Sequence, residues 1–199
     1  MSPILGTLAS QFSGKFFSSF ESIQTVTVGS GGSANVEFTS IPSTYTHLQI
    51  RYIGKTSRGT YANDALGMRI NGDAGNNYSF HILRTSENSN SATVVQGFGT
   101  QDKINFDYGS MGASGGGNVF FGVGIIDILD YKNTNKYKTV RCLYGVDNNG
   151  TVSGVYPITG ISSGLWQNTN AITSIELNTP ATGASFTQYS QFALYGVKS

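Results

Sequence analysis

The chain has 199 residues and a formal net charge of +1, which suits one large domain with its own hydrophobic core. Charged residues make up only 12% of the chain, and its lysines and arginines are scattered, which argues against a nucleic-acid-binding protein. No apolar run is long enough to span a bilayer, and Met1-Ser2-Pro3 stands where a cleaved signal peptide would carry positive charge, so we expect neither membrane insertion nor signal-directed export.

The first twenty residues carry a helical pattern. Ser2-Pro3 is typical of a helix start, because serine caps free amides and proline suits the first turn. Apolar side chains then recur every three or four residues, at Ile4, Leu5, Leu8, Phe12, Phe16 and Phe20. Gly6 and Gly14 each weaken a helix by about 1 kcal/mol relative to alanine, so the segment needs a surface to pack on. We predict that residues 1–21 form a helical or extended anchor that docks on a neighbouring subunit; packing on its own domain is the alternative.

From residue 22 onward, apolar and polar residues alternate and turn signals follow at short intervals, which is typical of strands. The expected strands cover residues 24–28, 34–38, 46–53, 66–70, 78–82, 93–97, 103–107, 119–129, 136–144, 152–161, 171–177 and 186–197. Asn71-Gly72 is a strong hairpin signal. The nearly continuous apolar run 119–129 is typical of a strand covered on both faces. We predict an all-β domain over residues 22–199, a two-sheet β-sandwich of jelly-roll type.

Residues that could carry catalysis are few. His47 and His81 are each predicted on the polar face of a strand, as solvated side chains. Asp127 and Asp130 stand three residues apart on an expected strand and so point to opposite faces, which prevents them from flanking one glycosidic bond. Cys142 is the only cysteine and lies in an apolar alternation, which predicts a buried thiol. We therefore expect no enzyme activity, no bound metal and no cofactor.

Three aromatic residues are candidates for glycan contact, because a flat aromatic face can stack on the C–H groups of a sugar ring. They are Trp166, Tyr61 and Tyr108. Trp166 falls in a loop-like stretch of small and polar residues, 163–168. A core or subunit-interface position is the favoured alternative for this tryptophan.

Ten segments spread over nearly the whole chain carry a family likeness. They are ILG (4–6), ASQ (9–11), FESI (20–23), TVGSGG (27–32), IPSTY (41–45), HLQIR (47–51), IDILDY (126–131), NTNKYKTVR (133–141), SGLW (163–166) and QYSQFALYGV (188–197). In these segments the chain resembles small virion structural proteins of tailed bacteriophages, labelled tail-fibre or capsid-associated proteins. The resemblance implies a surface-exposed particle component that forms a homo-oligomer, with a trimer as the first expectation, and that contacts other virion proteins. No catalytic residues come with it.

Together with the residue patterns, the resemblance implies a non-enzymatic structural subunit on the virion surface, made in the host cytoplasm and attached through its N-terminal segment as a capsid decoration or tail- or fibre-associated protein. Its low charge and abundant glycine, serine, threonine and asparagine suit a domain that packs against copies of itself, where an assembly covers exposed strand edges. The alternative is a carbohydrate-binding module of a phage fibre that recognises a host surface glycan.

Overall fold

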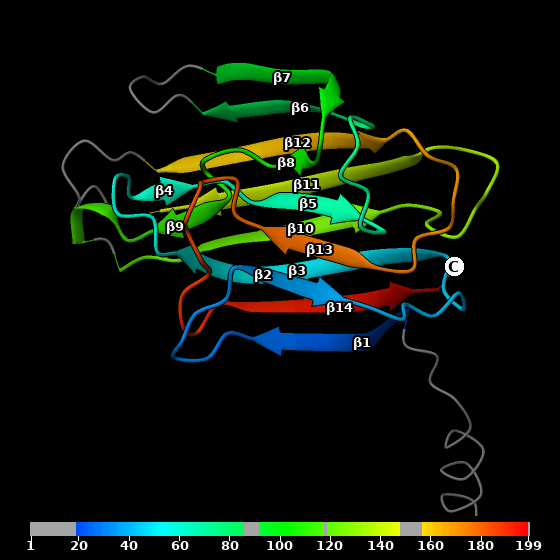
Figure 1. The fold of residues 1–199 in the computed structure, drawn as a ribbon, viewed down its shortest axis with the longest axis horizontal. Coiled ribbons are helices and arrows are strands. Elements are labelled where there is room, and N and C mark those ends of the chain that lie inside the picture. The colour runs from blue at the N-terminus through cyan, green and yellow to red at the C-terminus, as the bar shows by residue number, and fades with distance from the viewer. Residues whose placement is uncertain (1–18, 86–91, 118, 148–156, 199) are drawn as a thin grey trace, which may run out of the picture.

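The computed structural model describes residues 19–85, 92–117, 119–147 and 157–198 (Figure 1). In these ranges the chain forms fourteen strands and one short 3-10 turn, η1 (Gly115–Gly117). The prediction of an all-β fold is confirmed. None of the described residues belongs to a helix long and apolar enough to cross a bilayer.

The strands form two sheets that lie one in front of the other in Figure 1. The large sheet has the spatial order β1 (Phe20–Thr27), β14 (Gln191–Val197), β3 (His47–Thr56), β10 (Gly122–Ile128), β11 (Lys138–Val146), β12 (Ile158–Trp166), β6 (Tyr78–Thr85) and β7 (Ala92–Gln101). Two short strands join it beside the end of β3, namely β4 (Asn63–Asp64) and β9 (Met111–Ala113). The small sheet has the order β2 (Asn35–Phe38), β13 (Ile175–Asn178), β5 (Gly67–Ile70) and β8 (Ile104–Asn105). All the strand pairs are antiparallel except β3 with β9.

The core is built from side chains of both sheets, and along the long strands of the large sheet the buried residues alternate with more exposed ones. In β11 the buried residues are Lys138, Val140, Cys142, Tyr144 and Val146, and the residues between them are more exposed. Cys142 is fully buried, as predicted, and burial raises the pKa of its thiol. The period of two that identified the strands in the sequence is therefore also the period of burial.

Glycines on the inner face make room for tyrosine rings on the adjacent strand. Gly160 of β12 pairs directly with Tyr144 of β11, and a Cβ on this glycine would lie 2.8 Å from Cε2 of the ring. Gly124 of β10 accommodates Tyr52 of β3 in the same way. Each ring therefore covers its glycine, and the backbone there tolerates no larger residue without a shift.

The turn at Asn71-Gly72 differs from the prediction. Both residues have positive φ, 53° and 67°, as the dipeptide indicated. The predicted hairpin is wrong, however, because β5 belongs to the small sheet and β6 to the large one. The Asn71 side chain instead accepts hydrogen bonds from the amides of Thr173 and Ser174, at 2.8 and 3.1 Å. The turn carries the chain from one layer to the other.

Other predicted boundaries also shift. β1 begins at Phe20, so Phe20, the last residue of the predicted anchor stripe, belongs to the large sheet. The other stripe residues lie outside the described residues, namely Ile4, Leu5, Leu8, Phe12 and Phe16. β10 covers only part of the run 119–129 and ends before Asp130, which stands in a turn with φ 48°. The opposite-face prediction for Asp127 and Asp130 therefore does not apply, since only Asp127 is on the strand.

Candidate functional site

Arg58, Tyr61 and Tyr108 meet on the surface beyond the end of β3. The guanidinium carbon of Arg58 lies 4.3 Å from the centre of the Tyr61 ring and 5.3 Å from that of Tyr108. Both distances suit a cation–π interaction. The tyrosines are 57% and 49% exposed. The fold thus brings together two predicted glycan-contact residues and adds Arg58, which we did not predict from the sequence.

A buried carboxylate fixes Arg58 in this position. Asp64 lies 3.1 Å from Nη1 of Arg58, and its side chain is almost completely buried. The same carboxylate accepts hydrogen bonds from the Thr56 hydroxyl at 2.8 Å and from the Ala65 amide at 2.9 Å. Burial of a charge is tolerated only when it is paired and hydrogen-bonded, so these contacts hold the guanidinium in one orientation.

A second buried carboxylate holds the loop that presents Tyr108. Asp107 has φ 76°, and its carboxylate pairs with Arg84 at 2.9 Å and accepts a hydrogen bond from the Tyr144 hydroxyl at 3.3 Å. Burial raises the pKa of Tyr144, so its hydroxyl stays protonated and remains a donor. The Ser110 hydroxyl donates to the Asp107 carbonyl at 2.6 Å. The exposed tyrosine therefore stands on a loop tied to the core.

This cluster is suited to binding rather than to proton transfer. Its aromatic faces can stack on sugar C–H groups, and a guanidinium donates hydrogen bonds to hydroxyls or carboxylates. The two carboxylates beneath it, Asp64 and Asp107, are buried and already paired with Arg58 and Arg84. An open hollow adjoins Arg58 and is lined by Ser57, Gly59, Thr60 and residues 181–184. A ligand on the tyrosines would have room to extend there.

Trp166 is not available for such contact. Its side chain is only 1% exposed at the end of β12, and its indole N–H donates to the Asp73 carboxylate at 2.8 Å. Burial alone would raise the pKa of Asp73, but hydrogen bonds from Trp166, Asn77 and Gly75 lower it below its usual value. The loop prediction for 163–168 is wrong for its first four residues, which are strand. The core alternative is correct for Trp166.

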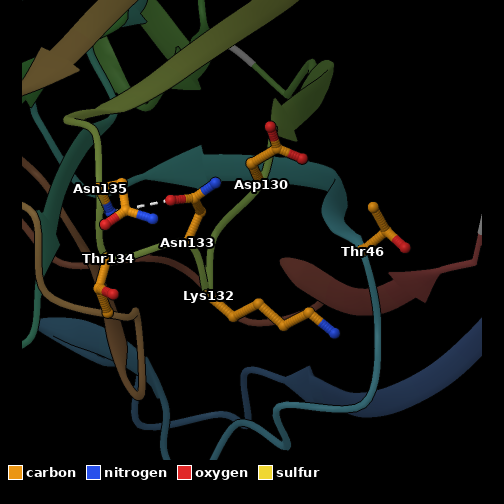
Figure 2. A pocket seen from close by; sticks show the side chains of 6 residues that line it. All are labelled: Thr46, Asp130, Lys132, Asn133, Thr134 and Asn135. Atoms are coloured by element: carbon orange, nitrogen blue, oxygen red, sulfur yellow. Dashed lines mark hydrogen bonds between the residues drawn. The ribbon is translucent and has the colours of Figure 1, made fainter.

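Figure 2 shows a polar hollow at the opposite end of β3, in the connection between β10 and β11. It is lined by Thr46, Asp130, Lys132, Asn133, Thr134 and Asn135. The amide of Asn135 donates to the side-chain oxygen of Asn133 at 2.8 Å, a contact typical of a tight turn. Local turn chemistry therefore accounts for these asparagines.

His47 stands beside this hollow, in contact with Asp130. Nδ1 of His47 accepts a hydrogen bond from the Asp130 amide at 3.0 Å and lies 3.5 Å from the carboxylate. A hydrogen bond from Lys136 is the main cause of a lowered pKa for Asp130. The other two candidates for catalysis lie elsewhere on the large sheet. His81 is exposed on β6, and the Asp127 carboxylate on β10 accepts a hydrogen bond from Gln49 at 2.8 Å. Among the described residues no three His, Cys, Asp or Glu side chains gather as metal ligands would.

The outer face of the large sheet carries a row of exposed aliphatic side chains. They pair directly across five adjacent strands, β10, β11, β12, β6 and β7, in the order Ile125, Leu143, Ile161, Leu83 and Val94. Their exposed fractions lie between 40% and 69%. Beside the row, Val123 of β10 pairs directly with Ile53 of β3, and these two side chains are 51% and 44% exposed. We call these seven residues the outer aliphatic row.

The outer aliphatic row contradicts one prediction. The apolar run 119–129 was expected on a strand covered on both faces, yet Val123 and Ile125 are exposed within the described part of the chain. The signal for the row was present in the sequence, since apolar residues such as Leu143 and Ile161 fall out of phase with the buried positions of their strands. Nothing local in the sequence shows that they align.

Polar residues beside the row are paired with each other. Asp127 of β10 lies between Gln49 of β3 and Arg141 of β11. Its carboxylate accepts a hydrogen bond from Gln49 and lies 3.3 Å from the guanidinium of Arg141. Arg51 donates to the Gln49 side-chain oxygen at 2.8 Å. The Asp127 carboxylate is therefore neutralised within the sheet, and a covering surface would not need to supply a counter-charge to it.

Comparisons of the chain with protein-family models, with curated proteins and with solved structures give no match.

Proposed function

We propose that this protein is a non-enzymatic structural subunit of a tailed-phage virion, exposed on the particle surface and attached through its N-terminal segment. The observation that carries the proposal is the outer aliphatic row. Large, aligned apolar patches on soluble proteins mark interaction surfaces, and here the patch spans six adjacent strands. A subunit that packs against other proteins would cover it.

The proposal includes a homo-oligomer, with a trimer first, and contact with other capsid or tail proteins. It also includes a jelly-roll relationship, supported by two nested strand pairs: β1 with β14 in the large sheet and β2 with β13 in the small one. Synthesis in the host cytoplasm followed by assembly onto the particle fits the sequence resemblance.

Purified virions test the assignment directly. Mass spectrometry of gradient-purified particles from a phage that carries this gene should detect the protein at a stoichiometry of many copies, and a density map should accommodate the two-sheet domain on the surface. Absence of the protein from intact infectious particles would refute a structural role.

Carbohydrate recognition is the second candidate function, and the cluster of Arg58, Tyr61 and Tyr108 favours it. The full-length protein should bind a subset of host surface glycans on an array, and replacing Tyr61 and Tyr108 together with alanine should abolish that binding. Tyr137 is similarly exposed, at 53%, and Tyr137→Ala is the matched control. Equal binding by all three proteins would place any glycan site elsewhere.

A further inference from the structure

We propose that the outer aliphatic row is the docking surface for residues 4–16 of a neighbouring copy of this chain. The inference rests on the proposed function, in which the N-terminal segment joins subunits, and it names the surface that receives the segment. It is carried by the register of the sheet, by the dimensions of the two surfaces and by the direction in which the chain enters β1.

The dimensions of the two surfaces match. From Ile125 to Val94 the row crosses four strand spacings, or about 19 Å at about 4.8 Å each. If residues 4–16 form the predicted helix, twelve rises of about 1.5 Å separate Ile4 from Phe16, or about 18 Å. Along that length the apolar stripe of the segment would face the aliphatic side chains of the row.

The charges of the two surfaces are also compatible. Lys15 is the only charged residue in the segment 4–16. The carboxylate of Asp127 beside the row is already engaged by Gln49 and Arg141. Docking would therefore leave the Asp127 carboxylate with the partners that it already has.

The direction of the chain favours a neighbour over the same molecule. The Lys198 amide donates to the Ser19 carbonyl at 3.1 Å, so the strand pairing of β1 extends back to Ser19. Phe20 stands, through β14, at the level of His47 in β3, whereas the row stands at the level of Arg51. From Phe20 back to Ser19, the strand therefore runs away from the level of its own row. This direction favours a neighbouring subunit as the acceptor of residues 4–16.

Such an exchange has a defined symmetry. Each subunit would offer its segment to one neighbour and receive a segment from another, which is a head-to-tail contact that can close into a ring. Three copies are the expected number, in agreement with the proposed trimer.

A pair of engineered cysteines tests the contact in the full-length chain. Phe12→Cys combined with Ile161→Cys should form disulfides between chains on mild oxidation, seen as dimers and higher multiples on a non-reducing gel. Phe12→Cys combined with Glu37→Cys is the control, because Glu37 is exposed on the small sheet. The native thiol of Cys142 is buried and should not compete. A disulfide formed only within single chains, or equal cross-linking in the control, would overturn the proposal.

A second pair of variants separates this inference from the proposed function. Leu83→Ser with Ile161→Ser alters the row, and Phe12→Ser with Phe16→Ser alters the segment. Light scattering should show that each double variant loses about threefold in mass, from trimer to monomer, and each should keep a cooperative melt. If only the segment variant dissociates, the segment joins subunits at another surface and the row is not its site. If the unmodified protein is itself a monomer, the proposed assembly fails as well.

Discussion

Gly160→Ala should destabilise the domain although the side chain gained is a single methyl group. The new Cβ would lie 2.8 Å from Cε2 of Tyr144, well inside normal contact distance. Overpacking of this kind costs about 1–3 kcal/mol. If the ring moves away instead, Tyr144 loses its hydrogen bond to the Asp107 carboxylate, which is worth about 1.5–3 kcal/mol. The two routes together predict a loss of about 1–3 kcal/mol, or a fall in Tm of about 2–12 °C for a chain of this size.

The matched control is Gly145→Ala on the adjacent strand β11. Its new Cβ would meet its nearest atoms at 3.4 Å and 3.5 Å, which is ordinary contact. Because alanine restricts the unfolded chain, this variant should be unchanged or more stable by up to about 1 kcal/mol. Urea titrations followed by fluorescence of Trp166, the only tryptophan, measure both. If the two variants agree within about 0.5 kcal/mol, the inferred packing of tyrosine over glycine is wrong.

Three further predictions concern the site, pH and the N-terminal segment. Asp64→Ala should lower the free energy of unfolding by about 3–5 kcal/mol, since it leaves Arg58 and its buried neighbours without their shared partner. Thermal melts measure this, with Asp127→Ala as a control whose stability should stay within about 1 kcal/mol of the unmodified protein. The pKa of Asp73 is lowered in the folded state, so its contribution to stability is present above the ordinary Asp pKa of about 3.9 and is lost as pH falls through the lower folded-state value. Asp73→Asn should remove this loss of stability from an acid titration followed by Trp166 fluorescence. Deletion of residues 1–18 should leave a cooperative melt but abolish the oligomer in light scattering, whereas precipitation or loss of the transition would show that the segment belongs to the core.

The local pattern of the sequence was sufficient for the strands. Alternation of apolar and polar residues predicted β3, β11 and most of the others, because a period of two follows from backbone geometry alone. The same logic predicted that Cys142 is buried. The local pattern was not sufficient for the connection at Asn71-Gly72. This turn has the backbone of a hairpin but joins two layers, because the choice of pairing partner depends on strands far away in the sequence.

The site depended on tertiary structure. Exposed Tyr61 and Tyr108 could be nominated from their loops, but Arg58 joins them only because Asp64 and Asp107, buried on separate segments, hold both loops in place. Trp166 was placed in the core by β12, which extends through a stretch that resembles a loop. The outer aliphatic row is the clearest case. Leu143 and Ile161 are out of phase with the buried positions of their own strands, but only the register of six strands, set by long-range hydrogen bonding, aligns the seven residues into one surface.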